Sequence, residues 1–75
     1  MLGRAMFAIE IVTVRAGKEP LVIDRATSVV SSVDDADRSA QSLLDKARRM
    51  RPHSPPNGYR IIDGHGAVVV RSWER

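Results

Sequence analysis

Residues 32–50, SVDDADRSAQSLLDKARRM, decide the fold. Apolar side chains recur there at steps of three and four residues, which places them on one face of an α-helix. They are Val33, Ala36, Ala40, Leu43, Leu44, Ala47 and Met50. Ser32 is suited to cap the first turn, because its hydroxyl accepts a hydrogen bond from a free backbone N–H. Pro52 has no backbone N–H to continue the helix. We therefore predict an amphipathic helix over Val33–Met50.

Strand patterns lie on both sides of this helix. Residues 7–14, FAIEIVTV, are rich in β-branched side chains and are apolar on both faces except at Glu10. Residues 15–20 contain Gly17 and Pro20 and predict a turn into a second strand over residues 21–30. After an irregular stretch, RPHSPPNG, residues 59–62 and 67–71 predict two more strands around a tight Asp63–Gly66 reversal.

The predicted order is strand, strand, helix, strand, strand. This order favours the α+β class, with two β-hairpins flanking one amphipathic helix and an antiparallel sheet whose one face the helix covers. A chain of 75 residues has room for one small domain, over residues 1–75. We expect residues 1–5 to form a flexible N-terminal tail.

The helix start, Ser32-Val33-Asp34-Asp35-Ala36, and the segment of residues 59–69, YRIIDGHGAVV, carry a resemblance. With the order of elements, they resemble short bacterial ββαββ proteins of unassigned function. The resemblance covers most of the chain and implies the fold. It implies no catalytic residues, and the Arg-rich helix end and the proline-rich loop are not part of the family's pattern.

Composition excludes several classes of protein. Hydrophobic residues make up 43% and charged residues 28% of the chain, which is typical of a folded domain. The absence of cysteine excludes a disulfide scaffold, a thiolate zinc site and a thiol nucleophile. Apolar runs are too short for a membrane helix, and Glu10 interrupts the N-terminal one, which predicts a strand there and not a secretory signal. We expect a cytoplasmic protein without a membrane partner.

Acidic residues collect at the start of the predicted helix. Asp34, Asp35 and Asp37 could be taken for metal ligands, but no central glycine or closing glutamate of a calcium loop follows them. Carboxylates at this position favour the positive end of the helix dipole, and we prefer that interpretation.

Basic residues collect at the other end of the helix. Arg48, Arg49 and Arg51, with Lys46 and His53 nearby, are the candidate contacts for a phosphate or a nucleic acid. The alternative is that cations simply favour the negative end of the helix dipole. Tyr59 is the only nearby aromatic residue that could stack on a base, whereas proteins that bind single strands use several.

The remaining motifs indicate loops. Gly64-His65-Gly66 lacks the third glycine and the following helix of a dinucleotide site. His53 and His65, with Asp63, are too few for a catalytic zinc site. Residues 52–55, PHSP, match a polyproline ligand pattern that also occurs by chance in loops. We therefore predict no catalytic, metal-binding or cofactor-binding residue.

Surplus apolar surface supplies the functional hypothesis. One helix covers only one face of a sheet, yet residues 7–14 are apolar on both faces. Alternation along the last strand would likewise place Val68 and Val70 on one face and Val69 on the other. We expect a non-enzymatic protein–protein interaction or assembly module that acts as a homodimer, either by covering the bare face or by pairing edge strands. The partner could also be another protein. The alternative is a small nucleic-acid-binding protein that uses Arg48, Arg49 and Arg51, and an enzyme is the third hypothesis.

Overall fold

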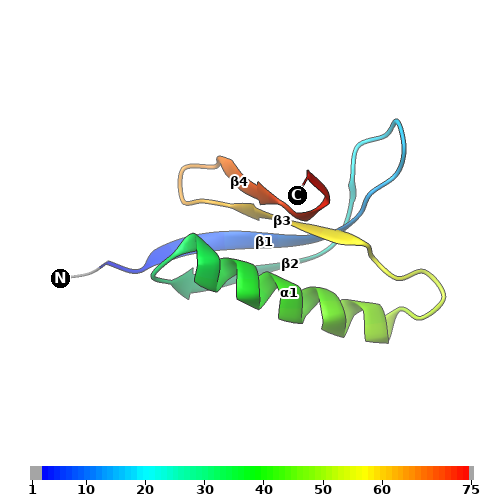
Figure 1. The fold of residues 1–75 in the computed structure, drawn as a ribbon, viewed down its shortest axis with the longest axis horizontal. Coiled ribbons are helices and arrows are strands. Elements are labelled where there is room, and N and C mark those ends of the chain that lie inside the picture. The colour runs from blue at the N-terminus through cyan, green and yellow to red at the C-terminus, as the bar shows by residue number, and fades with distance from the viewer. Residues whose placement is uncertain (1–2, 75) are drawn as a thin grey trace.

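The structure is a computed structural model that describes residues 3–74. Its elements are β1 (Ala5–Thr13), β2 (Leu21–Val30), α1 (Val33–Met50), β3 (Gly58–Ile62), β4 (Val68–Arg71) and a short 3-10 helix, η1 (Ser72–Glu74). The strands form one antiparallel sheet in the order β2-β1-β3-β4, and α1 lies across one face of it (Figure 1). The predicted ββαββ arrangement of the α+β class is confirmed.

The helix begins and ends where the sequence predicts. The Ser32 hydroxyl accepts a hydrogen bond of 3.1 Å from the Asp35 backbone N–H, as an N-cap should. At the other end, the backbone N–H of Arg51 donates to the carbonyl of Arg48 and closes the last turn. The local signals at both ends of α1 therefore act as expected.

The core lies between α1 and the face of the sheet that we call the helix face. Its buried residues come from two central strands and the first half of the helix: Phe7, Ile9, Ile11, Ala36, Ala40, Tyr59 and Ile61. Ala36 and Ala40 are fully buried, and small side chains at these positions let the helix approach the sheet closely. The opposite face carries no helix, and we call it the open face (Figure 1).

Two irregularities in the sheet change which residues share a face. The register shifts between Ile11 and Val12 where β1 pairs with β2, and between Ile61 and Ile62 where β3 pairs with β4. Because of the second shift, Val68 pairs with Ile62 on the open face. Val70 pairs with Ile61 and packs against the core. The simple alternation expected along residues 67–71 is therefore wrong.

The N-terminal strand starts earlier than its composition suggests. Strand β1 begins at Ala5, two residues before the predicted start, and ends at Thr13. The expected tail over residues 1–5 therefore overlaps the strand at Ala5, and residues 1 and 2 lie outside the described part of the chain. Beyond Thr13, Asn57 continues the pairing through its side chain: its Oδ1 accepts from the Val14 N–H, and its Nδ2 donates to the Val14 carbonyl.

Candidate interaction surface

A row of charged side chains crosses the open face. Glu10 on β1 stands opposite Arg25 on β2 and opposite Arg60 on β3, and Arg60 in turn stands opposite Arg71 on β4. We call these four residues the charged row. The row forms because the pairing of each strand with its neighbour brings these four residues into line across the sheet.

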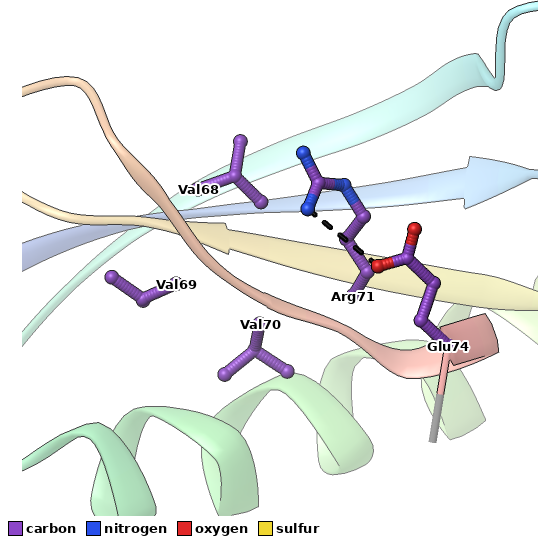
Figure 2. A pocket seen from close by; sticks show the side chains of 5 residues that line it. All are labelled: Val68, Val69, Val70, Arg71 and Glu74. Atoms are coloured by element: carbon purple, nitrogen blue, oxygen red, sulfur yellow. Dashed lines mark ion pairs between the residues drawn. The ribbon is translucent and has the colours of Figure 1, made fainter.

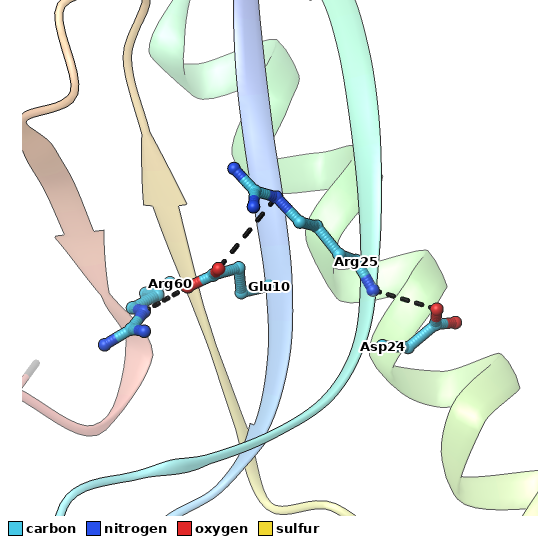
Figure 3. A network of polar contacts seen from close by, with 4 residues as sticks. All are labelled: Glu10, Asp24, Arg25 and Arg60. Atoms are coloured by element: carbon cyan, nitrogen blue, oxygen red, sulfur yellow. Dashed lines mark hydrogen bonds and ion pairs between the residues drawn. The ribbon is translucent and has the colours of Figure 1, made fainter.

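Glu10 is the centre of the charged row. Its side chain is only 10% exposed, its Oε1 accepts a hydrogen bond from the Arg60 Nε, and its Oε2 lies 3.9 Å from the Arg25 Nε (Figure 3). Arg71 pairs instead with Glu74 of η1, at 3.6 Å (Figure 2). The three guanidinium groups of the charged row therefore face only two carboxylates, the buried Glu10 and the peripheral Glu74. The net charge of this surface is positive.

An apolar patch adjoins the charged row on the open face. Met6 stands opposite Val29, and at the next level Thr27, Ala8, Ile62 and Val68 follow one another across the four strands. We call these six residues the Met6 patch. Met6 is 61% exposed and Val29 is 52% exposed. A single exposed apolar side chain is ordinary, but Met6 and Val29 are neighbours, and contiguous exposed apolar patches are typical of interaction surfaces.

The other end of the open face is closed by the C-terminal turn. A Cβ built on Gly58 would lie 3.1 Å from the Trp73 ring and 3.1 Å from the Ser72 Oγ, so the turn rests directly on β3. Ser72 is held there because its hydroxyl accepts a hydrogen bond of 2.9 Å from the Tyr59 backbone N–H. Val12, which pairs with Gly58, is fully buried. Part of the surplus apolar surface is thus covered within one chain.

The sheet has two very different edges. Strand β2 forms one edge with ten residues, LVIDRATSVV, among which Leu21, Val22 and Val29 are exposed. Strand β4 forms the other edge with four residues, and η1 follows it directly. A shallow groove at β4 is lined by Val68, Val69, Val70, Arg71 and Glu74, all close together in sequence (Figure 2). Exposed apolar side chains therefore concentrate on β2 and its neighbour Met6.

The predicted Arg cluster is spread around the end of the helix. Arg48 and Arg49 lie in the last turn, Arg51 is the C-cap, and all three are exposed. Tyr59, the candidate for base stacking, is not near the surface: it is 3% exposed and its hydroxyl donates to the Asp37 Oδ1 at 2.6 Å. The structure therefore removes the aromatic partner that a nucleic-acid site at this end would need.

The acidic cluster divides into two kinds of residue. Asp34 and Asp35 lie in the first turn, as the dipole argument expects. Asp37 is only 9% exposed and accepts hydrogen bonds from the Tyr59 hydroxyl and from the Gln41 Nε2, at 2.6 and 2.9 Å. The dipole interpretation is therefore wrong for Asp37, which ties α1 to β3.

The glycine-rich reversal is a turn held by Asp63. The Asp63 Oδ1 accepts hydrogen bonds from the backbone N–H groups of Ala67 and His65, which lower the pKa of this carboxyl below its ordinary 3.8. Gly66 has a φ of 84°, which a side chain would strain. Residues 3–74 contain no group of three or more His, Cys, Asp and Glu side chains placed to hold a metal ion.

The proline-rich stretch also turns. The Ser54 N–H donates to the Arg51 carbonyl at 3.2 Å, so residues 51–54 reverse direction and do not form the extended helix of a polyproline ligand. Pro56, at the end of the stretch, is fully buried. This loop therefore connects α1 to β3 as part of the scaffold.

Sequence reasoning missed the charged row. It noted Glu10 as the polar residue on an otherwise apolar face of its strand but did not connect it to Arg25 or Arg60, which lie 15 and 50 positions away. A carboxylate in the middle of an apolar strand was the available signal, since such a group needs a cationic partner when it is buried. Only the strand order supplies the identity of the partners.

Comparison with known proteins adds no assignment. No family model, curated protein or solved structure matches the chain. Within residues 3–74, the helices fall short of the length and hydropathy that crossing a bilayer requires.

Proposed function

We propose that this chain is a cytoplasmic, non-enzymatic protein–protein interaction module that acts as a homodimer. The observation that carries the proposal is the exposed apolar surface on β2, to which Leu21, Val22 and Val29 contribute. The chain exposes 5203 Å², whereas a compact monomer of 8.3 kDa exposes about 4600 Å².

The energetic scale supports self-association. A domain of 75 residues has a free energy of unfolding of about 4–11 kcal/mol. Fully burying one valine or methionine side chain contributes about 1.5–3 kcal/mol. Val22 and Val29 are already about half buried, so covering both in a second copy would contribute about 1–3 kcal/mol per chain, which is a substantial part of the chain's own stability.

Nucleic-acid binding remains the weaker alternative. Its support is the exposure of Arg48, Arg49 and Arg51 at one end of α1. Against it, Tyr59 is buried and bound to Asp37. This alternative predicts an affinity for single-stranded DNA that falls steeply with salt and that disappears when the three arginines are replaced by alanine.

Sedimentation equilibrium tests the proposal. We expect a reversible monomer–dimer equilibrium at micromolar concentrations, and we expect Val29→Thr to weaken it roughly tenfold, because each dimer loses two apolar contacts. Val69→Thr is the matched control: Val69 is similarly exposed, at 40% against 52%, but lies on β4. A wild-type chain that stays monomeric at several hundred micromolar would refute the proposal.

A further inference from the structure

We propose that two copies of this chain join through β2, as an antiparallel ladder centred on Ala26 of each copy. This inference rests on the proposed homodimer and specifies its interface. The four-stranded sheet would double to eight continuous strands, with both helices on the same side, because the symmetry axis of an antiparallel pair is perpendicular to the sheet.

The open face is a poor place for the second copy. Stacking two open faces would bring two charged rows together, each with Arg25 and Arg60 around Glu10 and with Arg71 opposite Arg60. The Arg60 side chain is already 25% exposed and the Glu10 side chain 10% exposed, so a dry interface would remove the remaining water from groups of net positive charge. Desolvated charges of like sign oppose such a contact. Edge pairing leaves the row in water.

Of the two edge strands, β2 is better suited than β4 to pair with a strand of another chain. Proteins protect exposed edges by shortening them or by placing lysine or proline in them. Strand β4 has four residues and gives way at once to η1, where Arg71 pairs with Glu74. Strand β2 has ten residues without a lysine or a proline. Its protective features, the charged residues Asp24 and Arg25 and the bulge at Ile23, leave residues 26–30 unprotected. β2 is the outermost strand on its side of the sheet. The Arg25 N–H donates to the Asp24 Oδ1 at 2.8 Å in the single chain, and pairing with a second copy would replace this bond with one to the new strand.

Charge selects the register of the proposed ladder. Residues that stand opposite each other share a face, and Asp24 and Arg25 pair with Ile11 and Glu10 on different faces. A ladder centred on Asp24 or on Arg25 would place that charge opposite its own copy, which is destabilising. A ladder centred on Ala26 places Asp24 opposite Ser28 of the second copy and Arg25 opposite Thr27. It therefore avoids both conflicts. Ladders centred on Thr27 or Ser28 avoid them too but pair fewer residues of β2, so charge and ladder length together favour Ala26.

A bulge in β2 determines which residues of the two copies would lie side by side at the ends of the ladder. Ile11 pairs with Asp24 and Val12 pairs with Val22, so Ile23 is the extra residue and Val22 lies on the open face. Beyond the regular stretch of residues 24–28, Val22 therefore comes beside Val29 of the second copy. These two side chains are 41% and 52% exposed in the single chain. Val22 of each copy would therefore contact Val29 of the other, once at each end of the ladder.

The helix side of β2 has room for the second copy. The helix lies over β1 and its neighbours, so two helices would be about 14 Å apart, or three strand spacings. Packed helices are about 8–10 Å apart, so neither helix obstructs the ladder. A groove beside β2 is lined by Asp24, Leu43, Lys46, Ala47 and Met50, and Met50 is 72% exposed. Because Asp24 would stand opposite Ser28 of the second copy, this groove and its copy would lie toward opposite ends of the ladder, each beside the strand of the other chain.

Cysteine cross-linking of the full chain tests the interface, because the sequence has no cysteine of its own. Opposite residues of an antiparallel pair have Cα atoms about 4.5–5.5 Å apart, within the reach of a disulfide. We expect mild oxidation to link Ala26→Cys into dimers at least tenfold faster than Thr27→Cys, whose copies would be offset along the ladder, or Val69→Cys on β4. If Ala26→Cys does not fold, a mixture of Asp24→Cys and Ser28→Cys offers the same test through opposite positions.

The outcomes separate this inference from the proposed function. A dimer by sedimentation in which Ala26→Cys links no faster than the two controls would overturn the β2 interface and leave the homodimer intact. Fastest linking at Val69→Cys would point to β4 and also overturn it. A monomeric chain at high concentration would remove both proposals. Concentration-dependent protection of the β2 amides against hydrogen exchange, without a change in β4, would support the ladder independently.

Discussion

Ile9 and Glu10 are neighbours on β1 and lie on opposite faces of the sheet. Both are buried, but by different kinds of cover. Ile9 is fully buried under α1 in an apolar core. Glu10 has no helix above it and is covered by Arg25 and Arg60 (Figure 3). The comparison teaches that one sheet in a very small protein can be closed on one side by packing and on the other by a layer of long charged side chains. The helix excludes water from Ile9, whereas the arginine side chains that cover Glu10 are themselves exposed to water.

The largest expected effect is the loss of packing on the helix face. Ile9→Ala removes most of a fully buried side chain, which costs about 2–5 kcal/mol. This loss is a large part of the roughly 4–11 kcal/mol expected for a 75-residue domain, so we expect unfolding at a much lower urea concentration. Urea denaturation followed by circular dichroism at one fixed protein concentration measures it. The control Val69→Ala, at an exposed site on β4, should cost less than about 1 kcal/mol, and equal losses would show that the two environments do not differ as described.

The second effect concerns the polar contact within the helix face. Tyr59→Phe removes the hydroxyl that donates to the Asp37 Oδ1 at 2.6 Å. We expect a cost of about 1–3 kcal/mol, because the buried carboxylate loses a donor. A double-mutant cycle with Asp37→Asn measures the coupling: the double variant should lose less than the sum of the single losses. Strictly additive losses would mean that the contact does not join α1 to β3 energetically.

The open face should respond more weakly and should depend on salt. Glu10→Gln removes the charge that Arg25 and Arg60 share, and we expect a loss of about 1 kcal/mol, since the Arg25 side chain is 64% exposed and its attraction is screened. The loss measured by urea denaturation should shrink between 0.05 and about 1 M NaCl. Glu19→Gln in the exposed β1–β2 loop is the control. A variant as stable as the wild type at low salt would contradict the role assigned to Glu10.

The smallest effect lies in the turn that joins β3 to β4. The backbone N–H groups of Ala67 and His65 lower the pKa of Asp63 from its ordinary 3.8. A carboxyl with a lowered pKa stabilises the fold at pH values above 3.8, and this contribution is lost as the pH falls through the lower pKa of the folded state. The amide resonances of His65 and Ala67 should therefore titrate below pH 3.8. Asp63→Asn should abolish this titration, and a midpoint at or above 3.8 in the wild type would contradict the assignment.

The sequence was sufficient for the helix and the turns because their causes are local. The apolar stripe of Val33–Met50, the Ser32 cap and Pro52 all act within a few residues of each other, and α1 has the predicted bounds. The Asp63–Gly66 reversal is similarly set by short-range hydrogen bonds. Of the apolar side chains expected to be surplus on the sheet, Val12 is buried and Val70 packs against the core. The most exposed apolar side chains of the sheet are Met6 and Val29, which the sequence did not single out.

The arrangement of the open face depends on contacts between distant residues and was out of reach. The pairing of β1 with β3 brings Glu10 to Arg60, fifty positions along the chain. The burial of Val12 depends on a C-terminal turn that no local signal directs onto β3. Asp37 was misjudged for the same reason, since its partner Tyr59 is on another element. Periodicity reports which side chains avoid water, and the sheet topology decides which polar groups meet.

The contact of Trp73 with the strand position of Gly58 has a practical consequence. The chain has a single tryptophan, so its intrinsic fluorescence reports on one place, the junction of the C-terminal turn with the open face. Helical ellipticity reports on the opposite side of the sheet. Recording both spectra during one titration would show whether the turn detaches before the helix melts, and would provide two optical probes of a very small fold without any added label.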